Sequence, residues 1–276
     1  MRSTMRMAMA AAAVLAIAGC KPAATGNGTG GNATASGGDA ISGTWKADAA
    51  SVKFDQKPDE MLLQNGQYSC KSCVPPVAVA VDGAFHPVTT PYADEMSVKV
   101  VDAHNVIRAS KKGGRQTVET KLTVSADGNT LTGSFTDTSV PNAPPGKGTF
   151  TETRVGAAPA GAHAISGQWK PSKLTGFNDT ALTVSYKLDG NTLHMTSPGG
   201  TSYDAKLDGS DAPIKGDLAG TTASVKKTGD NSFQETDKRG GKIVGVMTFT
   251  AANDSASATY ENKEDGSKIT YSAKKQ

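Results

Sequence analysis

The sequence contains one short tag twice, "DAISGTWKAD" at residues 39–48 and "HAISGQWKPS" at residues 163–172. These two stretches hold both tryptophans of the chain, Trp45 and Trp169, in a protein whose aromatic content is only 5%. Three further landmarks follow each tag in the same order, and each lies about 126 or 127 residues from its counterpart, against 124 residues between the two tryptophans. They are VDG and LDG, SVK in both copies, and KKGGR and KRGGK. This order predicts a duplicated domain.

The duplication predicts first and second domains at residues 41–155 and 165–276, joined by an Ala/Gly/Pro linker at 156–164. If each tag belongs to its own copy, replacing Trp169 by alanine should destabilise the second domain.

Within each copy the local pattern is typical of strands and hairpins. In "LTVSYKLDGNTLHM", residues 182–195, apolar side chains alternate with polar ones up to an Asp-Gly turn pair, and "KLTVSADGNTLTGSF", residues 121–135, repeats the pattern. Each copy contains about eight such short segments. The sequence therefore predicts an all-β protein of two tandem small antiparallel barrels. One helical turn is also expected in the twenty residues after Trp45.

The amino terminus carries a targeting pattern. Arg2 and Arg6 precede an apolar run at residues 7–19, which is typical of a secretory signal peptide and too short for a permanent membrane helix. The run ends in "IAGC", which resembles the lipobox of bacterial lipoproteins. The resemblance implies removal of residues 1–19 and acylation of Cys20, with chains such as palmitate anchoring the protein in membrane lipid. Lys21 then implies the outer membrane, with the protein facing the periplasm or exposed at the surface.

Residues 20–40 comprise this cysteine and a flexible Gly/Ser/Thr/Ala linker. The formal net charge of the chain is +3, and removal of the signal peptide takes away two arginines. A nearly neutral chain without clustered Lys and Arg excludes an electrostatic nucleic-acid interface.

The tags "SGTWK" and "SGQWK" resemble the G-x-W motif that opens the first strand of lipocalins. In that family the tryptophan closes the barrel floor beneath a cation from the last strand. The resemblance implies floor residues Trp45 and Trp169, and covering cations Arg154 and Lys275 or its neighbour Lys274. The lipobox, linker, paired tags and "PVTTPYAD" at residues 87–94 also resemble a group of uncharacterised proteobacterial lipoproteins with tandem lipocalin-like domains.

Cys70 and Cys73 form a C-x-x-C motif that the second copy lacks. Haem attachment would need a histidine after the second cysteine, zinc would need two more ligands, and a thioredoxin-type site would need a helix start. A small disulfide loop in an oxidising compartment is the fourth interpretation, and the one we favour.

Other polar residues give no recognisable catalytic or metal-binding pattern. His86 stands near Asp94 and Glu95, where acid–base or metal chemistry is conceivable, but solvated turn residues explain the pattern as well. KKGGR and KRGGK are interpreted as hairpin tips that could touch anionic lipid.

We therefore expect a non-enzymatic, membrane-anchored lipoprotein without cofactor or metal. Its function is either to bind a small apolar or amphipathic ligand, at unknown residues, or to contact envelope proteins through solid barrels. A barrel cavity of ~300 Å³ or more would favour the ligand.

Overall fold

The computed structural model describes residues 39–276. The predicted signal peptide, the lipidation site Cys20 and nearly all of the linker at residues 20–40 lie outside the described residues. The described chain is all-β, with two 3-10 turns, η1 (Ala49–Ser51) and η2 (Asp179–Ala181). The first falls in the segment after Trp45 where one helical turn was expected, and the Asp48 carboxylate accepts a hydrogen bond from the Ala50 amide at 2.9 Å. No helix in residues 39–276 combines the length and the apolar character needed to cross a membrane.

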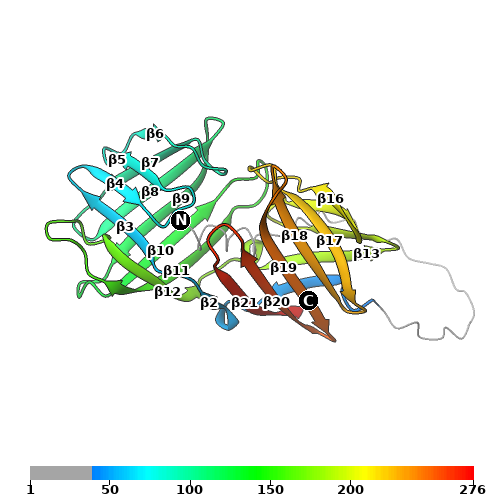
Figure 1. Ribbon diagram of the computed structural model, residues 1–276. Coiled ribbons are helices and arrows are strands. Elements are labelled where there is room, and N and C mark those ends of the chain that lie inside the picture. Colours follow the sequence, from blue (N-terminus) through cyan, green and yellow to red (C-terminus); the bar gives the residue numbers. More distant parts are fainter. Residues whose placement is uncertain (1–38) are drawn as a thin grey trace, which may run out of the picture.

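Two antiparallel sheets curl into two nearly closed barrels that lie side by side (Figure 1). This confirms the predicted fold class, although each sheet has ten strands in its path where about eight were expected. The sheet that we call barrel 1 has the strand order β5-β4-β3-β12-β11-β10-β9-β8-β7-β6. Its strands are β3 (Asp59–Gln64), β4 (Gln67–Cys70), β5 (Val77–Ala80), β6 (Phe85–Pro87), β7 (Glu95–Val100), β8 (Asn105–Lys112), β9 (Arg115–Val124), β10 (Thr130–Asp137), β11 (Gly146–Gly156) and β12 (Gly167–Thr175).

The other sheet, barrel 2, has the order β15-β14-β13-β1-β21-β20-β19-β18-β17-β16, and β2 adds to β21. A bridge between Ser202 and Lys215 joins its two ends. Its strands are β1 (Gly43–Ala47), β2 (Lys53–Asp55), β13 (Thr183–Asp189), β14 (Thr192–Thr196), β15 (Ser202–Lys206), β16 (Asp208–Pro213), β17 (Thr222–Gly229), β18 (Ser232–Arg239), β19 (Lys242–Ala252), β20 (Ser255–Asn262) and β21 (Lys268–Lys275).

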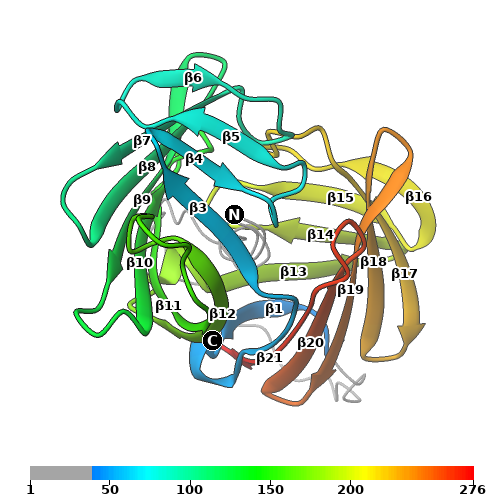
Figure 2. The same cartoon turned by 60° about the vertical axis from the view of Figure 1, so that its left-hand side comes forward.

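The two tag strands are exchanged between the barrels. The first tag forms β1, which pairs with β13 and β21 of the second repeat. The second tag forms β12, which pairs with β3 and β11 of the first repeat. Figure 2 shows β1 among the strands of barrel 2 and β12 beside β11. The sheets therefore do not follow the contiguous division into 41–155 and 165–276.

The exchange is possible because both tags present the same chemistry to any barrel of this type. In each, the fully buried tryptophan donates its indole N–H to the isoleucine carbonyl four residues earlier at 2.8 Å, Trp45 to Ile41 and Trp169 to Ile165. The serine hydroxyl of each tag accepts an amide hydrogen bond from the other repeat. Leu188 donates to Ser42 at 2.8 Å, and Leu63 donates to Ser166 at 2.9 Å.

The glycine of each G-x-W tag makes room for a cation. The Arg154 guanidinium lies 4.0 Å from the centroid of the Trp169 ring, and Lys275 Nζ lies 5.2 Å from that of Trp45. A Cβ at Gly167 or Gly43 would overlap these two side chains, and both glycines have positive φ. Each pairing joins the tag of one repeat to the last strand of the other repeat, because the tag strands are exchanged.

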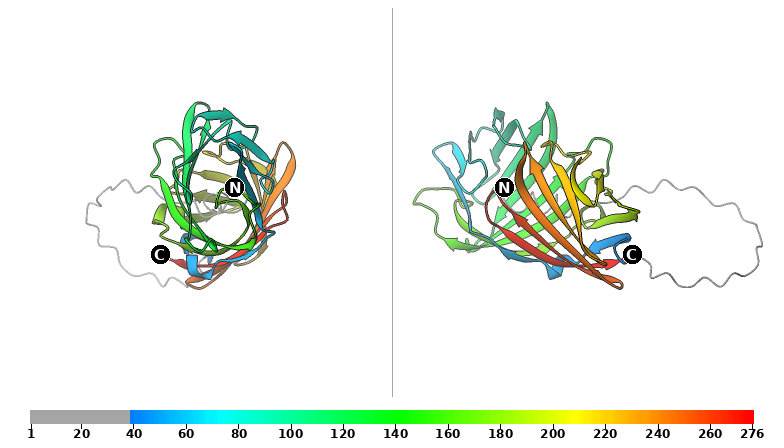
Figure 3. Two further views of the ribbon diagram at one scale, coloured as in Figure 1. Left: turned by 90° about the vertical axis from the view of Figure 1, so that its left-hand side faces the viewer. Right: turned by 45° about the vertical axis from the view of Figure 1, so that its right-hand side comes forward.

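The end-on view on the left of Figure 3 shows the strands curving around a central interior. The core of barrel 1 gathers around Trp169, Tyr68 and Leu131, and that of barrel 2 around Trp45, Phe249 and Phe233. In barrel 2 the aromatic rings contact one another directly, with the centroids of Trp45 and Phe249 5.4 Å apart.

Candidate ligand-binding cavity

The C-x-x-C motif forms a disulfide between Cys70 and Cys73, which confirms the interpretation that we favoured. The loop that it closes places Ser72 against the start of β3. There the Ser72 hydroxyl accepts a hydrogen bond from the Glu60 amide at 2.9 Å and approaches Asp59 Oδ1 at 3.4 Å. The disulfide therefore fixes a local contact between two segments of barrel 1.

The interior of barrel 1 contains charged side chains. Arg108 is 5% exposed and donates to the Tyr68 hydroxyl at 2.6 Å, while Glu152 is 2% exposed. Burial, and after it the charge of Asp59, raise the pKa of Glu152 to about 8, although Arg108 partly opposes the rise. This interior is occupied by protein groups, and Glu152 is neutral at and below neutral pH.

Glu152 should make the stability of barrel 1 depend on pH. Its pKa of about 8 in the folded state lies above the ordinary value of 4.5. Between these values the folded chain keeps a proton that the unfolded chain releases, so the free energy of unfolding falls as pH rises, by up to about 1.4 kcal/mol per unit. We expect urea unfolding at pH 5 and pH 8 to show this loss in the wild type and a smaller loss in Glu152→Gln. Equal losses in the two proteins would contradict the assignment.

The polar residues around His86 do not form one site. His86 Nε2 lies 2.8 Å from Asp82 Oδ1, Asp94 accepts from the Gly113 amide at 2.8 Å, and Glu95 pairs with Lys111 at 3.6 Å. Within residues 39–276 no group of three His, Cys, Asp or Glu side chains is placed to hold a metal ion.

The basic hairpin tips make contacts within the protein. In KKGGR, Arg115 donates to the backbone carbonyls of Thr138 and Ser139. In KRGGK, Lys238 pairs with Asp211 at 2.6 Å. These hydrogen bonds from Arg115 hold the loop that follows β10 of barrel 1 in place.

Arg239, also in the second tip, joins the two barrels. It pairs with Glu264 at 3.2 Å, and its guanidinium lies 5.0 Å from the ring centroid of Tyr92 in barrel 1. It also donates a hydrogen bond to the Tyr92 hydroxyl.

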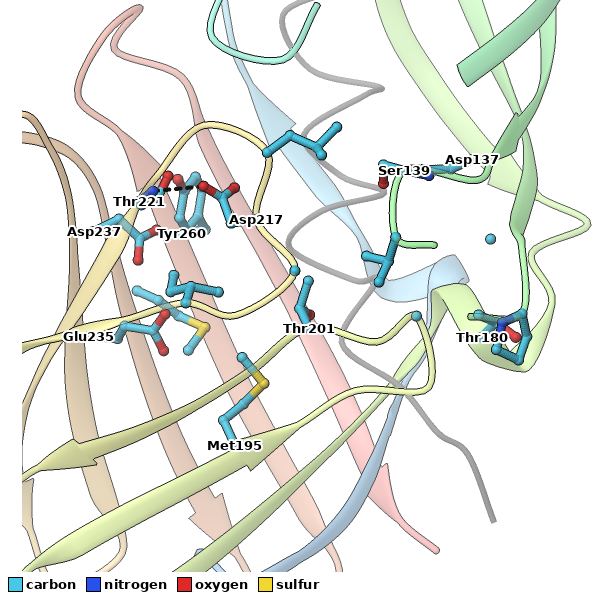
Figure 4. A pocket seen from close by; sticks show the side chains of 18 of the residues that line it. Asp137, Ser139, Thr180, Met195, Thr201, Asp217, Thr221, Glu235, Asp237 and Tyr260 are labelled. Carbon is cyan, nitrogen blue, oxygen red and sulfur yellow. Dashed lines mark hydrogen bonds between the residues drawn. The ribbon is translucent and has the colours of Figure 1, made fainter. Parts of the chain in front are cut away.

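A cavity of about 150 Å³ lies between the loop after β10 and the mouth of barrel 2 (Figure 4). The loop closes tightly over barrel 2, since a Cβ at Gly200 would lie 2.7 Å from Val140 Cγ1 and 3.0 Å from Ala143 Cβ. The side chains that line the cavity from barrel 2 include Tyr186, Met195, Ile214, Leu218, Glu235, Asp237, Met247 and Tyr260. Asp137, Ser139 and Val140 line it from barrel 1.

Two carboxyl groups form the polar end of this cavity. Glu235 is 8% exposed, and its Oε2 accepts a hydrogen bond from the Tyr203 hydroxyl at 2.6 Å. Burial raises the pKa of Glu235 well above its ordinary range, and the charge of Asp237 adds to the rise. Burial also raises the pKa of Asp237, against hydrogen bonds from Glu235 and Tyr260. Two neighbouring carboxyl groups buried in this way do not both ionise near neutral pH.

The two barrels carry a basic and an acidic residue at corresponding positions. Arg108 in β8 and Glu235 in β18 are separated by the spacing that relates the two SVK landmarks, about 127 residues. Each lies buried and hydrogen-bonds to a buried tyrosine hydroxyl, Arg108 to Tyr68 and Glu235 to Tyr203. The duplicated fold thus places a buried arginine in barrel 1 at the position where barrel 2 has a buried glutamic acid.

Sequence reasoning assigned no ligand-binding residue and missed this cavity. A signal was present in "FQETD", residues 233–237, where Glu235 and Asp237 stand on the same side of the strand as the buried Phe233. Carboxylates at inward positions of a strand indicate a polar barrel interior. The loop from the other repeat leaves no comparable local pattern.

Comparisons with known proteins add little. No family model and no curated protein matches the chain. Among solved structures, the crystal structure of TolB from Acinetobacter baumannii is similar over 86% of this chain and 65% of that one, with 13% sequence identity and a TM-score of 0.16. The chain thus spans less than two thirds of the TolB length, and a score this low carries no argument about fold or function.

Proposed function

We propose that the protein is a non-catalytic binding module of the cell envelope, anchored in the outer membrane through acylated Cys20 and facing the periplasm. Its site is the cavity at the mouth of barrel 2, and its ligand is a small amphipathic molecule. The lipobox and linker of the sequence support the anchor, and the β-barrel fold supports the resemblance to tandem lipocalin-like lipoproteins.

The cavity carries this proposal. Its volume of about 150 Å³ is half of what we expected for a ligand-carrying barrel, so the ligand must be small. Apolar cavities of about 150 Å³ accommodate molecules of the size of benzene. Met195, Met247 and Leu218 supply apolar contacts, while Glu235 and Asp237 supply a polar end. This combination suits an amphipathic molecule.

A set of small probes tests the proposal. We expect saturation-transfer NMR with cyclohexanol, benzylamine and hexanoate to detect at least one binder of the full chain in non-ionic detergent. Leu218→Trp should abolish that binding because Leu218 lines the cavity and the larger side chain takes up its volume. Ile243→Trp is the matched control, since Ile243 is 51% exposed and does not line the cavity.

Binding that survives Leu218→Trp, or an absence of binding by every probe, would refute the cavity as a ligand site. The second candidate function, an interaction protein of the envelope, would then be favoured. The charged side chains that fill the interior of barrel 1 already support that function for the first barrel.

A further inference from the structure

The lining of the barrel 2 cavity is acidic. Within residues 39–276, its lining side chains include four carboxylic acids and no lysine, arginine or histidine. The four acids are Asp137, Asp217, Glu235 and Asp237. This excess of acid contrasts with the formal charge of the whole chain, which is +3. A cavity with this lining favours a positively charged occupant and disfavours an anion.

One carboxyl oxygen at the acidic end of the cavity lacks a hydrogen-bond donor in the described residues. Asp237 Oδ1 is buried and receives no hydrogen bond from an N–H or hydroxyl donor in residues 39–276. A proton shared with Glu235 is the group that can satisfy it, because two neighbouring buried carboxylates are not both ionised at neutral pH. A bound cation could take the place of that proton.

The rest of the cavity suits the body of an organic cation better than a bare metal ion. Tyr186 and Tyr260 are among the lining side chains, and aromatic rings attract ammonium groups. Met195, Met247 and Ile214 add apolar side chains to the lining. No third His, Cys, Asp or Glu side chain in the described chain completes a metal-binding group with the carboxyl pair.

We propose that the ligand of this cavity is a small organic cation, an ammonium group on a compact apolar body, whose charge lies against Glu235 and Asp237. This inference rests on the proposed function and names the ligand class for the same site. Binding displaces the proton held between the two carboxyl groups into solvent, so one proton leaves for each cation bound.

The charged and titratable groups around the pair determine how binding depends on pH. Glu235 faces Asp237 and the tyrosine hydroxyls of Tyr186, Tyr203 and Tyr271. The tyrosines stay protonated, since burial raises their pKa values.

Besides Glu235, the groups that act on Asp237 are Tyr260, Asp217 and the cation Arg239. Because both carboxyl pKa values are raised, affinity for a cation should increase from pH 6 to pH 8.

Two probes of the same shape separate charge from size. Choline carries a permanent positive charge, and 3,3-dimethylbutan-1-ol is its neutral carbon isostere. We expect calorimetric titration of the full chain at pH 8 and low salt to show choline binding at least about tenfold tighter than the alcohol. Proton release should appear as a binding heat that varies with the ionisation enthalpy of the buffer.

Glu235→Gln keeps the size of the side chain and an acceptor for Tyr203 but removes the charge, so choline should lose its advantage. Asp237→Asn is the second variant and should reduce the advantage in the same direction. Asp230→Asn removes an exposed carboxylate outside the cavity and should leave the affinity for choline unchanged.

The outcomes distinguish two claims, that the cavity binds a small ligand and that this ligand is a cation. A tenfold preference that Glu235→Gln removes supports both. Equal binding of choline and the alcohol overturns the cationic ligand and leaves the proposed function standing. If neither probe binds, both fail. A preference that survives in both Glu235→Gln and Asp237→Asn overturns the assigned carboxyl pair.

Discussion

Replacing Trp169 by alanine is expected to destabilise barrel 1, the barrel built mainly from the other repeat. Trp169 is fully buried, donates its indole N–H to Ile165 and lies beneath Arg154. Truncation of such a residue typically costs about 3–5 kcal/mol, a large part of the stability of a small domain. The expectation from the repeats alone, that this change weakens the second domain, does not fit the sheet in which β12 lies.

Hydrogen exchange read by peptide mass spectrometry locates the effect. In Trp169→Ala, β3 and β11 should lose protection first, because they pair with β12. Trp45→Ala is the matched control and should expose β13 and β21 instead. Loss of protection confined to β13 and β21 in Trp169→Ala would contradict the exchange.

The fold could be predicted from the sequence because its determinants are local. Asn65 and Gly66 both adopt positive φ in the two-residue turn between β3 and β4, as an Asn-Gly pair between alternating segments indicates. The repeated tag correctly indicated two β-units. These features act within a few residues of chain, and the structure preserves them.

The exchange could not be predicted, because both tags carry the same binding groups. An isoleucine carbonyl, a serine hydroxyl, a glycine and a tryptophan recur at matching positions in the two copies. They specify the place of a tag strand in a barrel and do not distinguish one barrel from the other. The chain passes from one barrel to the other at residues 48–58 and 176–182, whose sequences differ and carry no repeated pattern.

The cavity was hidden for a related reason. Glu235 and Asp237 lie on one strand and were visible as inward positions, but part of the lining comes from β10 and the loop after it in the other repeat. Arg115 holds that loop through backbone carbonyls, a contact available to almost any loop sequence. The composition of this loop therefore does not indicate that it lines a cavity.

The exchange also predicts that the two repeats stay associated after the chain is cut in the linker between them, at residues 156–164. A protease site inserted between the exposed residues Pro159 and Ala160 divides the chain into residues 1–159 and 160–276. The first fragment carries β1 and β2 of barrel 2, and the second carries β12 of barrel 1. Each barrel then needs both fragments, so neither can leave without breaking strand pairing.

Gel filtration after cleavage should show one species of unchanged size, and denaturant should be needed to release the fragments. Two separate folded species under native conditions would contradict interlocked barrels. Contacts between the barrels, such as Arg239 with Tyr92, could also slow separation. A covalent readout of strand pairing is therefore more direct.

A disulfide between β1 and β13 tests the exchange most directly. Thr44 and Ser185 are register partners whose hydroxyl oxygens lie 2.8 Å apart, so cysteines there are within bonding reach. In the cleavable chain carrying Cys20→Ser, Thr44→Cys with Ser185→Cys should link the fragments under denaturing, non-reducing conditions. Gln168→Cys with Ser185→Cys, the pair expected of contiguous domains, should not oxidise. A disulfide in that second pair, with free thiols in the first, would contradict the exchange of the tryptophan strands.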